Sequence, residues 1–317
     1  MKTYKYLFLL IFPVLLWSCE SMVNDLGPDK LPKVASKLVV ECYISPQSEE
    51  IRVLVTESQP LLGPASYQPT FIKNATVSIS GENGEVKIPY VDSTTCYIID
   101  KSQFKIEAGK TYTLRVHDEK RSVQASCTVP LKAPTIKSYK IDSVPEVYAP
   151  ETFLARVKIS WDDIKGEKNF YTMRGYSIIV GTYPGYNPKN PGNSRPIRGT
   201  FKRVIETDLG NYLVNDINLD GISFEAPLFY VRLFSHNTFE YIDDNGEKQI
   251  AKSDPIFSEV YVEILNLDEN YYKFYRSQKD ARDNDNPFVE PTLVFTNIEG
   301  GLGCFGSYNV GSLSIKP

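Results

Sequence analysis

The chain has 317 residues, of which 42% are apolar and 12% aromatic, and its formal net charge is −4. This composition is typical of a folded protein with a large core and excludes an intrinsically disordered chain. Because 35 Lys and Arg face 39 Asp and Glu, no basic field is available for nucleic acid, and we expect no nucleic-acid partner.

Residues 1–18 have the pattern of a lipoprotein signal peptide. Lys2 and Lys5 precede the apolar run Tyr6–Leu16, which is too short to cross a bilayer as a mature helix. The run ends in Leu16-Trp17-Ser18-Cys19, which resembles a bacterial lipobox. We therefore expect cleavage before Cys19 and lipidation of its thiol, so that acyl chains anchor the mature protein in a membrane. The alternative is an ordinary secretory signal with an incidental cysteine.

Residues 19–36 form a polar tether, and residues 37–132 follow it as the first expected domain. Apolar and polar positions alternate in this domain, which predicts strands that bury one face. The sequence Asn83-Gly84 predicts a hairpin turn, and Gly109–Tyr112 suits a tyrosine corner. Together these features predict an immunoglobulin-like β-sandwich. The expected strands are Lys37–Ile44, Ile51–Thr56, Asn74–Ser80, Gly84–Val91, Thr95–Asp100, Thr111–His117 and Ser122–Val129.

Residues 133–317 form the second and larger expected domain, which is also rich in β-structure. Apolar residues alternate with polar ones from Phe153 to Trp161, and we expect Trp161 to be a core residue. Tyr183–Pro196 contains four prolines and two glycines and is predicted to be a long irregular loop, with a binding role left open. Further strands are expected at Phe170–Val180, Arg198–Thr207, Ile222–Leu233, Ile256–Leu265 and Thr292–Thr296.

One helix is expected near the C-terminus, at residues 267–279. Asn266 and Glu269 match a capping box at its start. Leu267, Tyr271 and Phe274 recur at helical spacing, which predicts a helix packed on a sheet.

The five cysteines do not show the close spacing of a zinc or redox site. Export permits disulfides, and Cys42 and Cys127 could bridge two strands of the sandwich. Cys42, Cys96, Cys127 and Cys304 could equally be buried free thiols, and the sequence leaves both alternatives open.

The sequence contains few groups for catalysis. His117 and His236 are the only histidines, and neither belongs to a nucleophile motif. Asp162 and Asp163 are adjacent in a predicted strand and would point to opposite faces. We therefore expect no enzyme activity and no cofactor.

A calcium-binding loop is the more specific alternative to a chain that has no ligand site. Asp216, Asn218 and Asp220, followed by Gly221, match the first half of a D-x-[DN]-x-[DN]-G loop. Pro227 stands where the loop needs its bidentate Glu. A turn rich in Asp and Asn explains the same residues, so they remain a weak calcium candidate.

The C-terminal segment carries a recognisable signature, in which Asp285-Asn286-Pro287-Phe288 is followed by Thr296–Gly306. This signature resembles that of a Bacteroidota lipoprotein family, domain of unknown function number 4249. The lipobox, the start at Lys37–Glu41 and the segment Asn74–Val77 resemble the same family. The glycines after Asn297 are explained by tight backbone packing or by ligand binding, and we favour packing.

The resemblance implies a cellular location but no chemical activity. Members of this family are similar to accessory lipoproteins of TonB-dependent outer-membrane receptors. We therefore expect an outer-membrane protein at the cell surface, anchored through Cys19, that helps such a receptor to capture an unknown solute. The periplasmic face remains an alternative location. A structural or adhesive surface lipoprotein is the alternative function, and a long unpaired edge strand would favour it.

Overall fold

The structure is a computed structural model that describes residues 35–59, 68–146, 149–188, 194–204, 212–226, 229–232, 238–243, 245–252, 256–283 and 292–316. These residues form a mainly β protein, as predicted, with one α-helix of several turns among them. No helix in these ranges is long and apolar enough to cross a membrane.

The first part of the chain is a sandwich of two sheets. One sheet contains β1, β2, β6 and β7, and the other has the order β5-β4-β8-β9. Their alternating apolar residues meet in one core, which also holds Phe305 from the end of the chain. The strands are β1 (Leu38–Ile44), β2 (Glu50–Glu57), β3 (Thr70–Phe71), β4 (Thr76–Gly81), β5 (Gly84–Ile88), β6 (Tyr90–Val91), β7 (Cys96–Asp100), β8 (Thr111–His117) and β9 (Ser122–Thr128).

Two local predictions in this sandwich are confirmed. The turn between β4 and β5 contains Asn83 and ends at Gly84, whose φ is +105°. The Tyr112 hydroxyl accepts a hydrogen bond of 2.8 Å from the backbone N–H of Glu107, as a tyrosine corner requires. The immunoglobulin-like arrangement of the whole sandwich stays a prediction.

The second part contains long antiparallel strands in two packed sheets. β10, β11, β15 and β16 form a four-stranded sheet that covers β12 and β19, with Trp161 fully buried between them, as predicted. β17 and β18 form a separate hairpin. The strands are β10 (Thr135–Glu146), β11 (Ala149–Asp162), β12 (Phe170–Tyr186), β13 (Ser194–Val204), β14 (Leu213–Asn215), β15 (Ser223–Glu225), β16 (Phe229–Arg232), β17 (Thr238–Ile242), β18 (Lys248–Lys252), β19 (Ile256–Leu267) and β20 (Leu302–Ile315).

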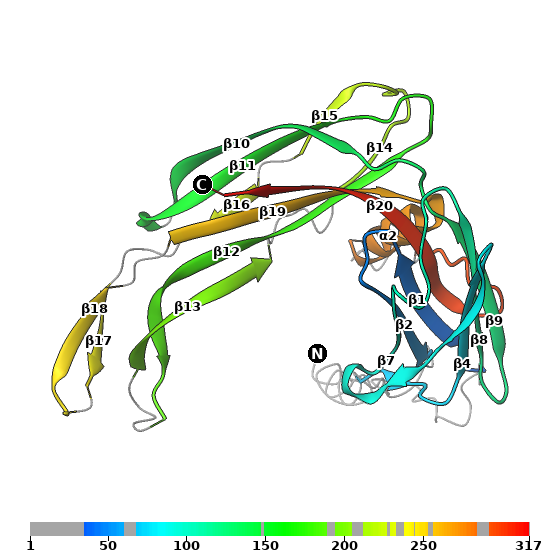
Figure 1. Cartoon of the computed structure of the whole chain (residues 1–317), viewed down its shortest axis with the longest axis horizontal. Helices are drawn as coiled ribbons and strands as arrows, with labels where there is room; N and C mark the ends of the chain where they lie inside the picture. Colours follow the sequence, from blue (N-terminus) through cyan, green and yellow to red (C-terminus); the bar gives the residue numbers. More distant parts are fainter. Residues whose placement is uncertain are drawn as a thin grey trace, which may run out of the picture.

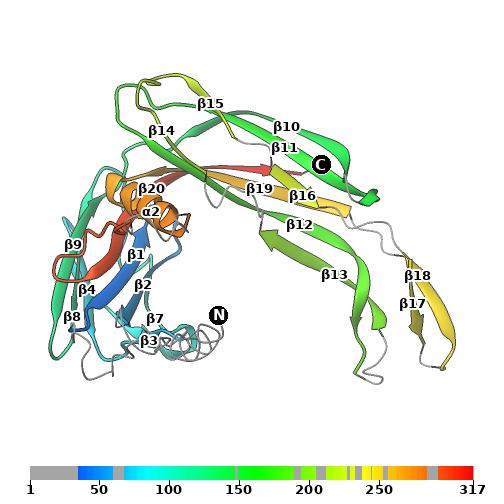
Figure 2. The same cartoon turned by 180° about the vertical axis from the view of Figure 1, so that it is seen from behind.

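The two parts make an arch (Figure 1). One limb is the sandwich, and the other ends in the hairpins β12–β13 and β17–β18, which hang from the free end of the long strands. The view from behind shows the same arrangement, with helix α2 (Glu269–Arg282) in the inner corner of the arch (Figure 2).

Strand β20 connects the two limbs within one ten-stranded sheet. Its first half pairs in parallel with β1, from Val39 opposite Leu302 to Ile44 opposite Ser307. Its second half pairs antiparallel with β19, from Leu267 opposite Tyr308 onward. β20 therefore belongs to the sheets of both parts. The expected domain boundary between residues 132 and 133 stays a prediction.

The prediction of an irregular loop at Tyr183–Pro196 was wrong over its described residues. β12 and β13 continue as a hairpin in which Pro184 lies opposite Pro196 and Tyr186 opposite Ser194. β13 is the last strand of its sheet, and an edge strand tolerates a proline because one side needs no ladder hydrogen bond. Residues 189–193 lie outside the described ranges.

Other boundaries also differ from the predictions. The expected strand Gly84–Val91 is two strands, β5 and β6, which belong to different sheets. Helix α2 begins at Glu269 with Asp268 as its N-cap, whereas Asn266 is still part of β19. Thr292–Thr296 forms no strand, and the final strand begins only at Leu302. Within the predicted strand at residues 222–233, the structure has two short strands, β15 and β16.

Candidate functional site

A groove opens on the inner side of the arch, where the outward face of β1 and β2 meets helix α2. β1 buries Leu38, Val40 and Cys42 in the sandwich, so Glu41 and Tyr43 point to the opposite face. The groove has a volume of about 530 Å³. We call it the tyrosine groove and define it by Glu41, Tyr43, Arg52, Arg174, Tyr271 and Tyr308.

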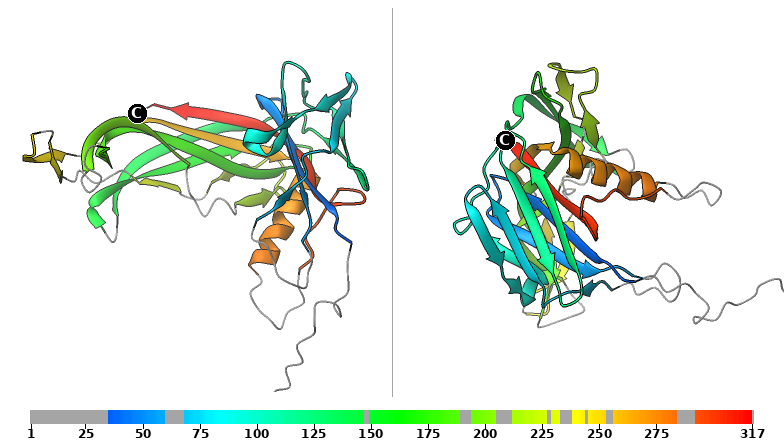
Figure 3. Two further views of the ribbon diagram at one scale, coloured as in Figure 1. Left: turned by 90° about the horizontal axis from the view of Figure 1, so that it is seen from below. Right: turned by 90° about the vertical axis from the view of Figure 1, so that its right-hand side faces the viewer.

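Tyrosine rings from three different elements form one side of this groove. The rings of Tyr43 on β1 and Tyr271 on α2 are stacked with their centroids 4.2 Å apart. Tyr308 on β20 lies 6.2 Å from Tyr271, and the Arg174 guanidinium lies over the Tyr308 ring at 5.2 Å. Figure 3 shows from two further sides how α2 lies beside β1 and β20, which brings these rings together.

The charged groups of the groove are largely paired. Arg52 forms an ion pair of 2.5 Å with Glu50, and Arg174 pairs with Glu263 of the neighbouring strand. Burial lowers the pKa of Arg174, but its interactions with Glu263 and Tyr308 together outweigh this effect and the net shift of the pKa is upward. Burial also raises the pKa of the Glu41 carboxyl.

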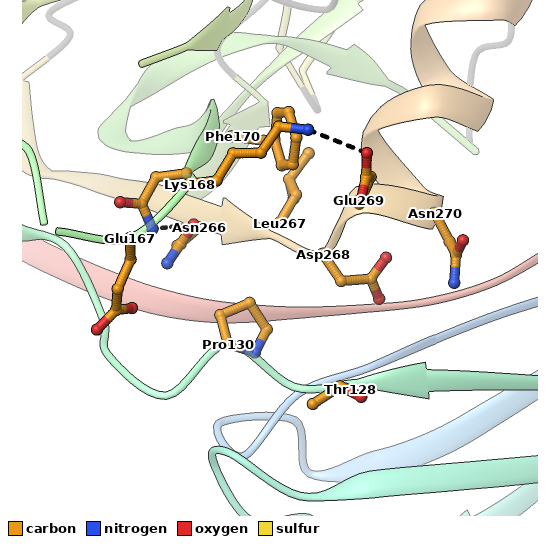
Figure 4. Close-up of a pocket in the computed structure, with 11 residues that line it drawn as sticks. Thr128, Pro130, Glu167, Lys168, Phe170, Asn266, Leu267, Asp268, Glu269 and Asn270 are labelled. Atoms are coloured by element: carbon orange, nitrogen blue, oxygen red, sulfur yellow. Dashed lines mark hydrogen bonds and ion pairs between the residues drawn. The ribbon is translucent and has the colours of Figure 1, made fainter. Parts of the chain in front are cut away.

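A second cavity, of about 370 Å³, lies at the junction of the two limbs. It is bounded by Thr128 at the end of β9, by Pro130 in the connection that follows, by the loop before β12 and by the start of α2 (Figure 4). The ammonium of Lys168 reaches across its mouth to Glu269 at 3.0 Å. The amides of Asn169 and Asn266 hydrogen-bond to each other beside it.

Side chains around this junction hold the connection between the limbs in place. Ser307 donates to the Thr128 carbonyl at 3.0 Å, and Asn309 donates to the Pro130 carbonyl at 3.0 Å. Asn266 donates to the Lys132 carbonyl at 3.2 Å. Because each bond satisfies a backbone carbonyl at the end of β9 or in the connection that follows it, we interpret this cavity as structural.

The C-terminal glycine signature is explained by close packing, as we favoured. A Cβ atom on Gly303 would lie 2.1 Å from the Val40 carbonyl oxygen, and one on Gly301 would lie 2.8 Å from that of Leu38. Asn297 also both accepts from the Phe305 N–H and donates to its carbonyl, at 3.0 and 2.8 Å, in the manner of a neighbouring strand. The part of the signature at residues 285–288 lies outside the described ranges.

Two of the calcium candidates accept hydrogen bonds from backbone N–H groups of the loop before β12, and the calcium site stays a prediction. Asp216 accepts from the Asn169 N–H at 3.0 Å, and Asp220 accepts from the Gly166 N–H at 2.7 Å. Asn218 has a φ of +64°, which is typical of a turn. Within the described ranges no group of three His, Cys, Asp or Glu is placed to hold a metal ion.

The remaining predicted residues have the following positions. Cys19 and His236 lie outside the described residues, so the lipidation of Cys19 stays a prediction. Asp162 bonds to Ser223 at the surface, whereas Asp163 is buried against the Tyr171 hydroxyl, so the two carboxylates do not share a site. His117 is exposed. The other cysteines, Cys42, Cys96, Cys127 and Cys304, are all buried and free.

Sequence reasoning missed the residues of the tyrosine groove. They come from β1, β2, β12, α2 and β20, and no spacing in the chain links them. The available signal was local: Glu41 and Tyr43 occupy the solvent phase of a strand whose other phase is fully apolar. An exposed aromatic at such a position needs a cover, which α2 supplies.

The comparisons with known proteins give a family and little more. No curated protein matches the chain. Among solved structures it is similar to one described as "Biofilm associated protein - B domain", with 7% identity over 88% of this chain and 85% of that chain. The TM-score of 0.15 carries no argument about fold or function. The family model described as "Domain of unknown function (DUF4249)" matches residues 26–314, and the chain therefore belongs to that family.

Proposed function

We propose that the protein is an outer-membrane lipoprotein that captures a solute for a TonB-dependent receptor without catalysing a reaction. The observation that carries the proposal is the tyrosine groove, a cavity of about 530 Å³ on the inner face of the arch. Its size and its mixture of aromatic and charged side chains are typical of small-molecule binding sites.

Two features support binding rather than catalysis. Arg52 and Arg174 are each neutralised by a neighbouring carboxylate instead of flanking a nucleophile. The serine that lines the groove, Ser48, has its hydroxyl 3.3 Å from the hydroxyl of Tyr308, whereas a nucleophilic serine is usually activated by a neighbouring histidine.

Membrane attachment would keep the groove close to the receptor that takes up the captured solute. Lipidation at Cys19 would confine the groove to the membrane surface that carries the receptor, joined by a tether of fewer than twenty residues. Confinement of two partners raises their effective concentration, so even a weak contact with the receptor would suffice.

The alternative of an adhesive surface protein has one observation in its favour, the long edge strand β13. Arg198, Lys202 and Pro196 lie along this edge. Basic residues and proline on an edge strand oppose pairing with another chain, so this edge is protected rather than adhesive.

Co-purification tests the proposal. We expect the full-length lipoprotein, extracted from outer membranes in mild detergent, to retain a TonB-dependent receptor. A Cys19→Ser variant should lose membrane attachment and appear in the soluble exported fraction. A Tyr43→Ala, Arg174→Ala variant should keep the receptor but take up less solute. Anchored native protein recovered without any receptor would contradict the proposal.

A further inference from the structure

The tyrosine groove has one charge that its own side chains do not balance. Glu49 pairs with Lys101 at 2.5 Å, and Glu50 pairs with Arg52 at 2.5 Å. Arg174 pairs with Glu263. Among the described residues, only the Glu41 carboxylate in this groove has neither an ion pair nor a hydrogen bond.

The surroundings of Glu41 offer it no internal partner. In the sheet it lies opposite Leu54 of β2 on one side and Cys304 of β20 on the other. Tyr43, two residues along the same face, is covered by Tyr271. A partly buried carboxylate between apolar and aromatic neighbours has lost much of its hydration, and a cation would compensate that loss.

The tyrosines beside Glu41 already accept a cation at one position. The Arg174 guanidinium lies 5.2 Å from the centre of the Tyr308 ring, and Tyr308 lies next to Tyr271. Aromatic rings attract cations through their negative faces, and they do so most strongly where water is excluded. The same cluster therefore has the electrostatic character that an organic cation needs.

We propose that the tyrosine groove binds solutes through a compact organic ammonium group, with Glu41 as the counter-ion and Tyr43, Tyr271 and Tyr308 as the aromatic surface. The inference rests on the proposed capture function and names its substrate class. A bare metal ion does not fit, because calcium takes six to eight oxygen ligands and Glu41 provides at most two. A solute whose only charge is negative is disfavoured by the unpaired carboxylate.

A pair of probes that differ only in charge tests this inference. Choline carries a permanent positive charge, and 3,3-dimethylbutan-1-ol is its neutral isostere. We expect the full-length lipoprotein in detergent micelles to bind choline about tenfold more tightly than the alcohol, measured by ligand-observed NMR titration. Glu41→Gln should abolish this preference, whereas Glu225→Gln, which removes an equal charge on the other limb, should preserve it.

The pH dependence of the wild type provides a test that needs no variant. Choline cannot titrate, so any change in its affinity reports the protein. Because burial raises the Glu41 pKa, choline binding should weaken as the pH falls into the range where this carboxyl is protonated. Equal affinity for the two probes, an unaltered preference in Glu41→Gln, or no binding of either probe would overturn the inference. None of these results would alter co-purification with a receptor, so the two proposals fail separately.

Discussion

At the scale of single residues, Gly303 and Gly84 have nearly the same φ in different surroundings. Their φ angles are +104° and +105°, a region that residues with a Cβ rarely adopt. Around Gly84 a Cβ would meet nothing within 4 Å, whereas at Gly303 it would lie 2.1 Å from the Val40 carbonyl oxygen. Alanine substitution at the two positions therefore separates the free-energy cost of an unfavourable φ from the cost of steric overlap.

We predict that Gly84→Ala lowers the free energy of unfolding by about 1 kcal/mol, the cost of the unfavourable φ alone. Gly303→Ala should cost at least about 2 kcal/mol more, because β1 and β20 must also move apart. Urea denaturation of both variants measures the difference. Equal losses of stability would show that the sheet absorbs the extra atom without strain.

The four cysteines of the body allow a prediction about reactivity. Cys42, Cys96, Cys127 and Cys304 are all buried and free, and burial raises the pKa of the Cys42, Cys127 and Cys304 thiols. Reaction with a disulfide reagent needs an accessible thiolate. We expect none of these four thiols to react in the native lipidated protein and all four to react in denaturant, as counted with Ellman's reagent. A thiol that reacts rapidly without denaturant would contradict this packing.

At the scale of elements, the start of α2 combines a helix cap with a joint between strands. Asp268 accepts from the Tyr271 N–H at 2.8 Å, as an N-cap does, and also from the Ser307 hydroxyl at 2.6 Å. The same cap therefore holds α2 on β20 and fixes Tyr271 in the tyrosine groove. Burial raises the Asp268 pKa to about 6 from an ordinary value of 3.8, although these hydrogen bonds oppose the shift.

This raised pKa predicts an unusual pH dependence of stability. Between about pH 4 and about pH 6 the folded state binds the Asp268 proton and the unfolded state does not. The stabilisation from this bound proton is therefore complete below this pH range. It is lost as the pH rises through the range, which lowers the free energy of unfolding by up to about 3 kcal/mol. Asp268→Asn cannot titrate, so wild type should lose stability relative to this variant as the pH rises. Parallel unfolding free energies across this range would contradict the prediction.

The sequence predicted most strands of the sandwich because their local patterns agree with their environment. Thr111–His117 was predicted to the residue, since Tyr112, Leu114 and Val116 alternate with polar residues over a single buried face. Isolated prolines misled the prediction at Pro184 and Pro196, which lie opposite each other in the hairpin of an edge strand. Local composition does not reveal that a strand lies at an edge.

The final strand and the groove needed tertiary information. β20 contains Gly303, Gly306 and Gly311, which lower its strand propensity. They are present because β1, α2 and the connection at Pro134 approach its backbone, and these neighbours are distant in sequence. The tyrosine groove depends on the same approach, because a Cβ on Gly306 would lie 2.7 Å from the Cβ of Tyr271.

At the scale of the whole molecule, the chain closes on itself through β20. The first strand of the sandwich pairs with one of the last segments of the chain, and Phe305 is fully buried in the sandwich core. Gln124 of β9 also bridges to Glu299 just before β20. The sandwich is therefore built from both ends of the chain, although residues 37–132 contain its other strands.

This topology predicts that residues 35–132 do not fold alone. The fragment would lack β20, leaving β1 as an open edge and a gap in the core where Phe305 packs, for which a loss of about 3–5 kcal/mol is typical of an aromatic residue alone. We expect little cooperative unfolding of the fragment by circular dichroism, and recovery when residues 292–316 are joined to it through a flexible linker. The same linker joined to a scrambled 292–316 segment is the control. A fragment that unfolds cooperatively without β20 would show that the sandwich is an independent domain and that β20 is only attached to it.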